Sequence, residues 1–600
     1  MAHPLAVLSI IYVIASYTGY CLLNFLLIQR HNARRARELK CLDPPTLPSH
    51  RILGLDHLKA ALNADKAKEF PVEMVRRRDQ VGAETFLYST MGSNNIFTSD
   101  EKNIQAILAT QFKDFIIGPR RRNNFFPLLG NGIFTQDGAG WEHSREMMRP
   151  QFAREQVSDL NLEEQHVQNM MRAIVPKANG WADTLDLQIL FFRLTLDSAT
   201  EFLFGKSVDS QLVALHVKNG SCDESQKVDF FGTAFDKGQS VLATRSRMQG
   251  LYWLYNPKKF KKSCTDCHAF IDDFVNIALS KNLPGAAEKS VSADAEKGTR
   301  KKYVFLDALA AETRDPLELR SQMLNILLAG RDTTASLIGW VCYALARDPE
   351  RFNKLRNVVL EEFGTYSNPR DISFGRLKLC QYLRYVINEA LRLYPVVPIN
   401  SRTAAKDTTL PRGGGPDGKS PVFVPKDTPC GYSVFVMHRR RDIWGDDADI
   451  FVPERWEKRK VGWEFLPFNG GPRICIGQQF ALTEASGTGV KLFPLLIRDN
   501  WSLFKFQSNC DEGSIMPAMP ARRGEHNDEG SIMPAMPAEL KLCGVRGVGT
   551  EAEVESGLPD RAMLRKGAAP FLPPAGFVLS ANRIEDFSSI NHVITVWWVQ

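Results

Sequence analysis

Cys475 has surroundings that favour one specific chemistry. It belongs to the segment Phe468-Asn469-Gly470-Gly471-Pro472-Arg473-Ile474-Cys475-Ile476-Gly477. A thiolate at the start of a helix is stabilised by the free N–H groups and the positive partial charge of that end. The glycines permit a tight loop and the close approach of a flat cofactor. These features favour a cysteine that binds haem iron over the alternative, a buried cysteine that packs as a small apolar side chain.

Two neighbours of Cys475 support this interpretation. Arg473 can pair with a haem propionate, and Phe468 can pack beside the sulfur and shield it. The segment matches F-x-x-G-x-R-x-C-x-G at every fixed position and resembles the haem-binding segment of the cytochrome P-450 family. The resemblance implies a mainly α-helical fold with small β-sheets, and haem b with Cys475 as the axial ligand of its iron. Such a thiolate favours cleavage of the O–O bond.

A long helix is predicted over residues 316–347. Asp315 can cap it, Pro316 suits its first turn, and Asp348-Pro349 would end it. At about 1.5 Å per residue, such a helix would cross a whole domain. It must therefore position any chemistry that its middle carries.

The middle of this helix contains Ala329-Gly330-Arg331-Asp332-Thr333-Thr334. A glycine within a helix costs about 1 kcal/mol relative to alanine, so Gly330 is either tolerated for packing or has a function. The family resemblance implies that the helix opens here beside the iron and leaves room for O2. Thr333 would then hydrogen-bond the bound oxygen, and Asp332 would help to relay protons to it.

Three further residues resemble contacts to the haem propionates. Trp141 and Arg145, in WEHSREMMRPQF, lie one helical turn apart and match the family's W-x-x-x-R. The alternative is an ordinary amphipathic helix with an exposed arginine. Arg402, in NSRTA, resembles the family's third propionate contact.

Glu389 and Arg392, in NEALRLYP, lie three residues apart and so share one face of a helix. Most such pairs are surface ion pairs, which is the alternative here. In the family, this pair joins an arginine from a later P-E-R segment, and that arginine is Arg455 in this chain. The resemblance implies a buried network behind the haem that supports the fold and haem retention rather than the chemistry.

A second cysteine motif points to a different cofactor. Cys264-Thr265-Asp266-Cys267-His268 matches C-x-x-C-H, the attachment motif of c-type haem. That attachment needs an oxidising compartment, and the surrounding lysine-rich stretch has apolar residues at helical spacing. A zinc site would need a second pair of ligands. We therefore expect an ordinary helix at this motif.

The N-terminal residues 1–29 are predicted to form a transmembrane anchor. No charged residue occurs from Pro4 to Ile28, and a helix of that length can span a hydrocarbon core of roughly 30 Å. A cleaved signal peptide is the alternative, but this apolar run is long and lacks a basic start. Four arginines follow at once: Arg30, Arg34, Arg35 and Arg37. They predict a single-pass protein of the endoplasmic reticulum membrane whose catalytic body faces the cytosol.

The rest of the chain divides into three parts. We expect a basic, proline-rich linker over residues 30–50, a haem-thiolate catalytic domain over 51–505 and an atypical, poorly ordered tail over 506–600. The tail contains the string DEGSIMPAMPA twice, at 511–521 and 528–538. Two short copies are too few for a solenoid.

The chain departs from the family after Glu484. The family continues this helix for several turns and ends with a small β element that lines the pocket. Here Gly487, Gly489 and Pro494 are expected to interrupt the helical pattern. The terminal strands have no clear counterpart in the tail.

Composition limits the possible partners. The 600 residues carry a net charge of +7, without a concentrated basic patch interleaved with aromatic residues, so no nucleic acid partner is expected. The 11 cysteines are odd in number and lack framework spacing, which favours a reducing compartment.

Four segments resemble most closely the fungal membrane-bound n-alkane and fatty-acid ω-hydroxylases. They are LLGNGIFTQDGAGWEHSREMMRPQF, LLAGRDTTA, TLPRGGGPDGKSPVFVPKDT and FNGGPRICIGQQFALTEA. The resemblance implies a monooxygenase that binds membrane lipid and hydroxylates a long-chain apolar substrate at or near its terminal carbon. It would use O2 and electrons from NADPH through NADPH–cytochrome P-450 reductase, which would dock near Arg145 and Arg149.

Two alternatives remain open from the sequence. One is an isomerase of fatty-acid hydroperoxides with the same fold, although such an enzyme would not need the pair Asp332 and Thr333. The other is an inactive product whose altered C-terminus prevents haem loading.

Overall fold

The computed structural model describes residues 4–153, 160–174, 185–218, 225–281, 303–495 and 541–542. The fold is mainly helical with small β-sheets, as the sequence predicts. Both copies of the repeated string, and the predicted tail of residues 506–600 except for Lys541–Leu542, lie outside the described residues.

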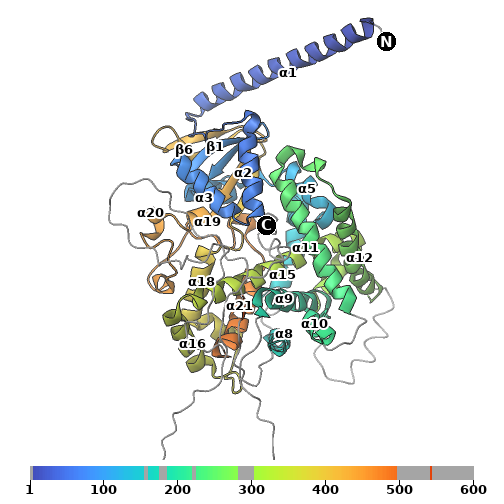
Figure 1. The fold of residues 1–600 in the computed structure, drawn as a ribbon, viewed down its shortest axis with the longest axis vertical. Coiled ribbons are helices and arrows are strands. Elements are labelled where there is room, and N and C mark those ends of the chain that lie inside the picture. Colours follow the sequence, from blue (N-terminus) through green and yellow to red (C-terminus); the bar gives the residue numbers. More distant parts are fainter. Residues whose placement is uncertain are drawn as a thin grey trace, which may run out of the picture.

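The α-helices are distributed along the whole described part of the chain. Their bounds are α1 (Pro4–Glu38), α2 (Leu55–Lys66), α3 (Phe70–Val81), α4 (Glu101–Gln105), α5 (Pro119–Leu129), α6 (Gly138–Met148), α8 (Leu160–Arg172), α9 (Leu187–Phe204), α10 (Ser210–Lys218), α11 (Ser225–Arg247), α12 (Lys258–Lys281), α14 (Phe305–Glu312), α15 (Pro316–Ala346), α16 (Pro349–Phe363), α17 (Phe374–Leu379), α18 (Gln381–Leu393), α19 (Val434–Met437), α20 (Arg441–Trp444) and α21 (Gln478–Leu492). Figure 1 shows α15 passing through the middle of the helical part, with α9, α18 and α21 around it.

The strands form three small sheets. Their bounds are β1 (Thr85–Thr90), β2 (Ser93–Thr98), β3 (Phe115–Ile116), β4 (Leu185–Asp186), β5 (Ile399–Ala404), β6 (Thr408–Gly414), β7 (Ser420–Val424), β8 (Pro429–Ser433) and β9 (Lys541–Leu542). The largest sheet has the order β1-β2-β8-β5-β3, in which only β2 and β8 run parallel among the described strands. Strands β6 and β7 form an antiparallel hairpin, and β4 pairs antiparallel with β9.

Helix α1 stands apart from the body, next to the β-rich end of the molecule (Figure 1). Its side chains from Ile11 to Ile28 are largely exposed, and among the described residues it is the one helix long and apolar enough to cross a membrane. The helix runs on through the arginines to Glu38. A hydrogen bond of 2.9 Å between His31 Nε2 and Asp407 Oδ2 joins its basic end to the body.

Helix α15 confirms the long helix predicted from residue 316. Asp315 Oδ1 accepts a hydrogen bond of 2.9 Å from the N–H group of Leu317, so Asp315 caps the helix as expected. Pro316 occupies the first turn. Most of the helix is buried on every side, which places its middle in the centre of the domain.

Helix α21 corrects one expectation from the sequence. It continues without interruption through Gly487 and Gly489 to Leu492, and only then passes into a 3-10 turn that contains Pro494. Both glycines are buried, and a Cβ atom at Gly487 would lie 3.5 Å from Cγ of Glu163 on α8. Burial of α21 between its neighbours therefore outweighs the intrinsic cost of about 1 kcal/mol for each glycine in a helix.

Candidate active site

A cavity lies where α15, α9, α6 and the segment 466–477 meet. The space between protein atoms here, counted together with its opening to solvent, is about 1480 Å³. Seven predicted site residues line it: Trp141, Arg145, Thr333, Arg402, Phe468, Arg473 and Cys475. The fold thus brings together residues from four separate parts of the chain.

The loop that carries Cys475 is shaped by close backbone packing. The N–H group of Cys475 donates a hydrogen bond of 3.0 Å to the carbonyl oxygen of Phe468, which closes the loop before α21 begins at Gln478. Gly471 has a φ of +67°, and a Cβ atom there would lie 1.9 Å from the carbonyl oxygen of Leu108. This glycine is therefore required by the approach of the protein's own backbone.

The Cys475 thiol is protonated in the absence of a metal ion. Burial raises its pKa to about 11, while the N–H group of Gly477 and the charge of Arg145 act in the opposite direction. A thiol with this pKa keeps its proton at neutral pH, whereas coordination to a metal ion deprotonates it. Without a metal ion this cysteine is therefore a neutral thiol, and only coordination would make it the thiolate.

Two predicted arginines, Arg145 and Arg473, lie over the ring of Trp141, and a third, Arg402, is close enough to Arg473 for their charges to interact. Arg473 lies over the Trp141 ring at 4.4 Å from its centroid and donates a hydrogen bond of 2.8 Å to Asp137 Oδ1. Arg145 donates one of 3.1 Å to the carbonyl oxygen of Ile474, next to Cys475. Arg402 reaches Asn400 Oδ1 at 3.3 Å.

Arg121 is a fourth member of this cluster that the sequence analysis missed. It is buried on α5, and its Nη1 donates a hydrogen bond of 2.8 Å to the same Asn400 Oδ1. The spacing of apolar residues does not single it out, because Arg122 has the same i, i+4, i+7 pattern with Phe126 and Leu129 and yet is exposed.

These arginines concentrate positive charge in a buried place. Burial and the charge of Arg402 lower the pKa of Arg121 to about 9, and the same two causes lower that of Arg473 to about 9. Buried cations need nearby anions, and within the described residues Asp137 is the carboxylate bonded to the cluster. The two propionates of haem would supply the missing negative charge, so the residues present fit this cofactor.

On α15 the structure separates Thr333 from Asp332. Thr333 lines the cavity, and its Oγ1 donates a hydrogen bond of 2.6 Å to the carbonyl oxygen of Ala329. The neighbouring Gly330 also lines the cavity, and a Cβ atom there would lie 3.7 Å from the nearest protein atom, on Ala199. Gly330 is therefore not required by helix packing and leaves open space toward the cavity.

Asp332 points away from the cavity toward α11. Its Oδ2 accepts a hydrogen bond of 3.1 Å from Nε2 of Gln239, and its Oδ1 lies 3.4 Å from Arg331. Arg331 is itself paired with Asp236 of α11 at 2.5 Å. Burial raises the pKa of Asp332 to about 6, against the opposing charge of Arg331.

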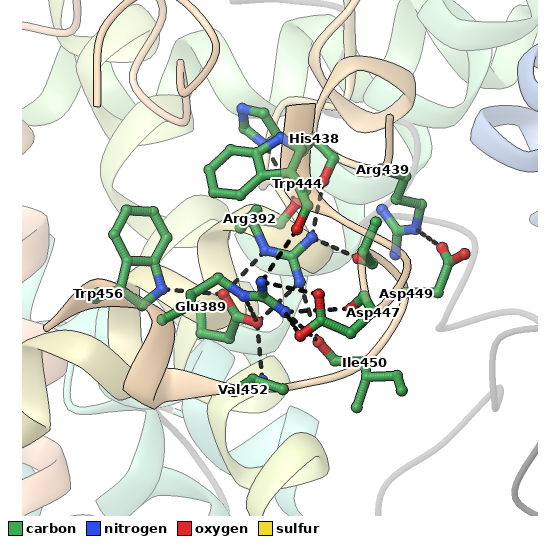
Figure 2. Close-up of polar contacts among 12 residues, drawn as sticks. Glu389, Arg392, His438, Arg439, Trp444, Asp447, Asp449, Ile450, Val452 and Trp456 are labelled. Atoms are coloured by element: carbon green, nitrogen blue, oxygen red, sulfur yellow. Dashed lines mark hydrogen bonds and ion pairs between the residues drawn. The ribbon is translucent and has the colours of Figure 1, made fainter. Parts of the chain in front are cut away.

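Glu389 forms the centre of a buried polar network (Figure 2). It and Arg392 have no exposed surface, so they do not form the surface ion pair that was the alternative. Glu389 accepts hydrogen bonds of 2.8–2.9 Å from Arg392, Arg455, the N–H group of Val452 and the indole of Trp456. Arg392 also donates to the carbonyl oxygens of His438, Ala448 and Ile450. These residues lie outside the cavity lining and hold α18 to the segment 438–456.

The C-x-x-C-H motif lies in the middle of α12, as the helical spacing predicts. Cys264 and Cys267 are buried, and burial raises the pKa of Cys264 to about 12. Nε2 of His268 lies 2.9 Å from the carbonyl oxygen of Leu128, at the end of α5. The motif therefore packs α12 against its neighbours.

Comparisons with known proteins identify the family of this chain. The family described as Cytochrome P-450 matches residues 55–488. The chain is 57% identical over 486 residues to cytochrome P-450 monooxygenase g430 of Fusarium sp., across 81% of this chain and 84% of that protein. It is 46% identical over 479 residues to cytochrome P-450 52A12 of Debaryomyces hansenii, across 79% and 89% of the two chains. Against cytochrome P-450 52A6 of Candida tropicalis it is 46% identical over 465 residues, across 76% and 86%.

These matches confirm the family that the Cys475 segment predicts. They cover the cavity, the arginine cluster and the Glu389 network alike. The chain therefore belongs to the cytochrome P-450 family of monooxygenases, which bind haem.

Proposed function

We propose that this enzyme hydroxylates long-chain fatty acids or n-alkanes at or near the terminal carbon. The overall reaction is RH + O2 + 2 electrons + 2 protons, giving ROH and water. Haem, when bound, supplies the site at which O2 is activated. The catalytic body is assigned to residues 51–505, and its electrons would come from NADPH through NADPH–cytochrome P-450 reductase.

The lining of the cavity is the observation that carries this proposal. Apart from the residues assigned to the haem, its walls are mostly aliphatic and aromatic: Ile117, Ile133, Phe134, Phe152, Ala199, Phe202, Leu203, Ile326, Ala329, Leu337, Leu391, Val396 and Val397. Such walls suit a long apolar chain, since each methylene removed from water contributes about 0.8 kcal/mol. The segments similar to fungal alkane and fatty-acid hydroxylases support the same substrate class.

Individual residues of the chain would bind the haem and transfer the proton. Cys475 is the iron ligand, and Arg145, Arg402 and Arg473, which line the cavity, pair with the propionates. Arg121 lies outside the lining and supports Asn400, to which Arg402 is also bonded. Thr333 presents its hydroxyl to the cavity and can pass a proton from Oγ1 once it releases the carbonyl oxygen of Ala329.

Asp332 would supply that proton. A carboxyl group with a pKa of about 6 can exchange a proton near neutral pH. It must first turn from Gln239 and Arg331 toward Thr333, because its side chain faces α11 in this structure.

The surface next to the Cys475 loop supports docking of an acidic reductase. Arg149 is exposed at the end of α6, one turn beyond Arg145, which contacts Ile474. Ile474 itself is 39% exposed, so the loop reaches the surface there. A basic surface beside the redox centre favours rapid association with an acidic partner.

Exposed apolar side chains support attachment of the body to a membrane in addition to α1. Ile52 and Leu53 are 83% and 58% exposed, and Trp253 and Leu254 are 61% and 57% exposed. Apolar patches of this kind mark surfaces that contact lipid or protein. We assign the protein to the endoplasmic reticulum membrane, with the body on the cytosolic side.

The test is turnover of defined substrates by the full-length enzyme. The enzyme is combined with reductase, NADPH and either hexadecanoic acid or hexadecane, and the position of the new hydroxyl group is found by mass spectrometry. Products oxidised at the terminal or adjacent carbon are expected. Products hydroxylated only in mid-chain would contradict the proposal, and NADPH-independent conversion of a fatty-acid hydroperoxide would favour an isomerase instead.

A further inference from the structure

The loop between α5 and α6 forms part of the cavity wall. It comprises residues 130–137, and Ile133 and Phe134 in its first part line the cavity. Thr135 closes the loop on itself, because its Oγ1 donates to the carbonyl oxygen of Gly130 at 2.7 Å and accepts from the N–H group of Gly132 at 2.9 Å. The loop is thus a compact unit that needs an external anchor to fix its place.

Asn325, in the first half of α15, provides that anchor. Its side chain has no exposed surface. Its Oδ1 accepts a hydrogen bond of 3.0 Å from the N–H group of Phe134, and its Nδ2 donates one of 3.0 Å to the carbonyl oxygen of Leu129. A second bond from Nδ2, of 2.7 Å, goes to Ser321 of its own helix and fixes the orientation of the amide. One side chain therefore holds both ends of the wall segment.

The close contact between loop and helix is a second, independent observation. A Cβ atom at Gly132 would lie 2.3 Å from Asn325 Nδ2, and one at Gly130 would lie 2.2 Å from Ser321 Oγ. Glycine at both positions lets the loop backbone come against α15. The distance between Phe134 and α15 is therefore set by a direct contact that a larger side chain would change.

Hydroxylation of a terminal carbon requires a fixed cavity wall, which the bonds of Asn325 can provide. The C–H bonds of a terminal methyl group are stronger than those of the adjacent methylene, so reactivity alone favours the methylene. An enzyme that oxidises the terminal carbon must hold the chain so that the methylene cannot take its place. This requires walls that do not move aside, and buried backbone groups bonded to a fixed amide make such a wall.

We propose that Asn325 is a positioning residue that determines regiochemistry by fixing Ile133 and Phe134 in the cavity wall. This inference rests on the proposed function. Asn325 does not line the cavity, so it acts through the loop. When its amide is lost, the N–H group of Phe134 and the carbonyl oxygen of Leu129 lose a buried partner, and the loop shifts to find another.

The experiment uses two variants that disturb the contact between Asn325 and the loop, one changed on the helix and one on the loop. Asn325→Leu removes the amide at similar volume, and Gly132→Ala places a methyl group against an intact Asn325. The control is Gln211→Leu, because Gln211 is equally buried and donates a comparable bond of 2.7 Å to the carbonyl oxygen of Leu190, away from the loop. Hydrogen exchange of residues 129–136 by mass spectrometry reports on the loop without turnover.

The ratio of terminal to adjacent-carbon product from hexadecanoic acid is expected to fall about tenfold in both variants, since one net hydrogen bond corresponds to roughly that factor. Exchange in the loop should become faster, and the control should change neither quantity. An unchanged ratio in an active Asn325→Leu or Gly132→Ala enzyme would overturn the inference, as would unchanged exchange. A wild-type enzyme that forms no hydroxylated fatty acid would instead overturn the proposed function.

Discussion

Replacement of Glu389 by glutamine tests whether the buried network sustains the fold. The carboxylate of Glu389 accepts bonds from Arg392 and Arg455, from the N–H group of Val452 and from the indole of Trp456. Glu389→Gln keeps the shape but removes the charge that balances Arg392, which is fully buried. Removing one partner of a buried ion pair costs about 3–5 kcal/mol, a large part of a typical folding stability of about 5–15 kcal/mol.

A matched control lies in the same segment as Arg455. Glu454 bonds Arg351, Lys354 and Tyr382 at 2.9 Å each, but its side chain is 34% exposed. Exposed ion pairs contribute about 0.2–1 kcal/mol each, so Glu454→Gln should cost about 1 kcal/mol. The two variants therefore differ in burial and not in the kind of group that is changed.

The assay is urea unfolding of the haem-loaded protein, followed by the haem absorbance and by circular dichroism. Glu389→Gln should unfold at clearly lower urea concentration than Glu454→Gln and lose haem during purification. Equal destabilisation by the two variants would refute the reasoning, because burial would then not determine the cost. A variant too unstable to purify would be compared in the detergent extract, by the fraction of chain that holds haem.

Three further outcomes are expected. Arg121→Leu should release haem to apomyoglobin up to about tenfold faster than the exposed-neighbour control Arg122→Leu, because Asn400 loses a bond that helps to hold it beside Arg402. Equal rates would remove Arg121 from the arginine cluster. The pKa of Asp332 is about 6 in the folded state, above its ordinary value of 3.8. Between these two pH values the folded state therefore binds more protons than the unfolded state. The free energy of unfolding should fall as pH rises through this range, by at most about 3 kcal/mol. Asp332→Asn should lack this fall, and parallel pH profiles would contradict the assignment. Deletion of residues 1–40 should weaken flotation with phospholipid vesicles while haem binding is kept; unchanged flotation would show that α1 is not the main anchor.

The cysteine site could be predicted because its information is local. Cys475, Arg473 and Phe468 lie within one loop, and the pair Trp141 and Arg145 lies on one helical turn. All five line the same cavity. Spacing along the chain fixes such relations before any tertiary contact is known.

Residues whose role depends on distant contacts were harder to place. The sequence does not reveal that Asp332 turns toward Gln239 of α11, or that Asn325 reaches the loop before α6. The prediction that the glycines of α21 interrupt the helix was wrong, because burial keeps the helix intact where its local propensity is low. Arg121 was missed because Arg122 has the same apolar spacing, and only tertiary packing decides which of the two arginines is buried.

The most direct test of the account is the carbon monoxide spectrum of the reduced, full-length enzyme and of its Cys475→His variant. Haem with a thiolate ligand should give a strongly red-shifted Soret band in the wild type, and the variant should give an unshifted band. Haem bound without the shift in the folded wild type, or a shift that persists in Cys475→His, would contradict the assignment of Cys475 as the iron ligand.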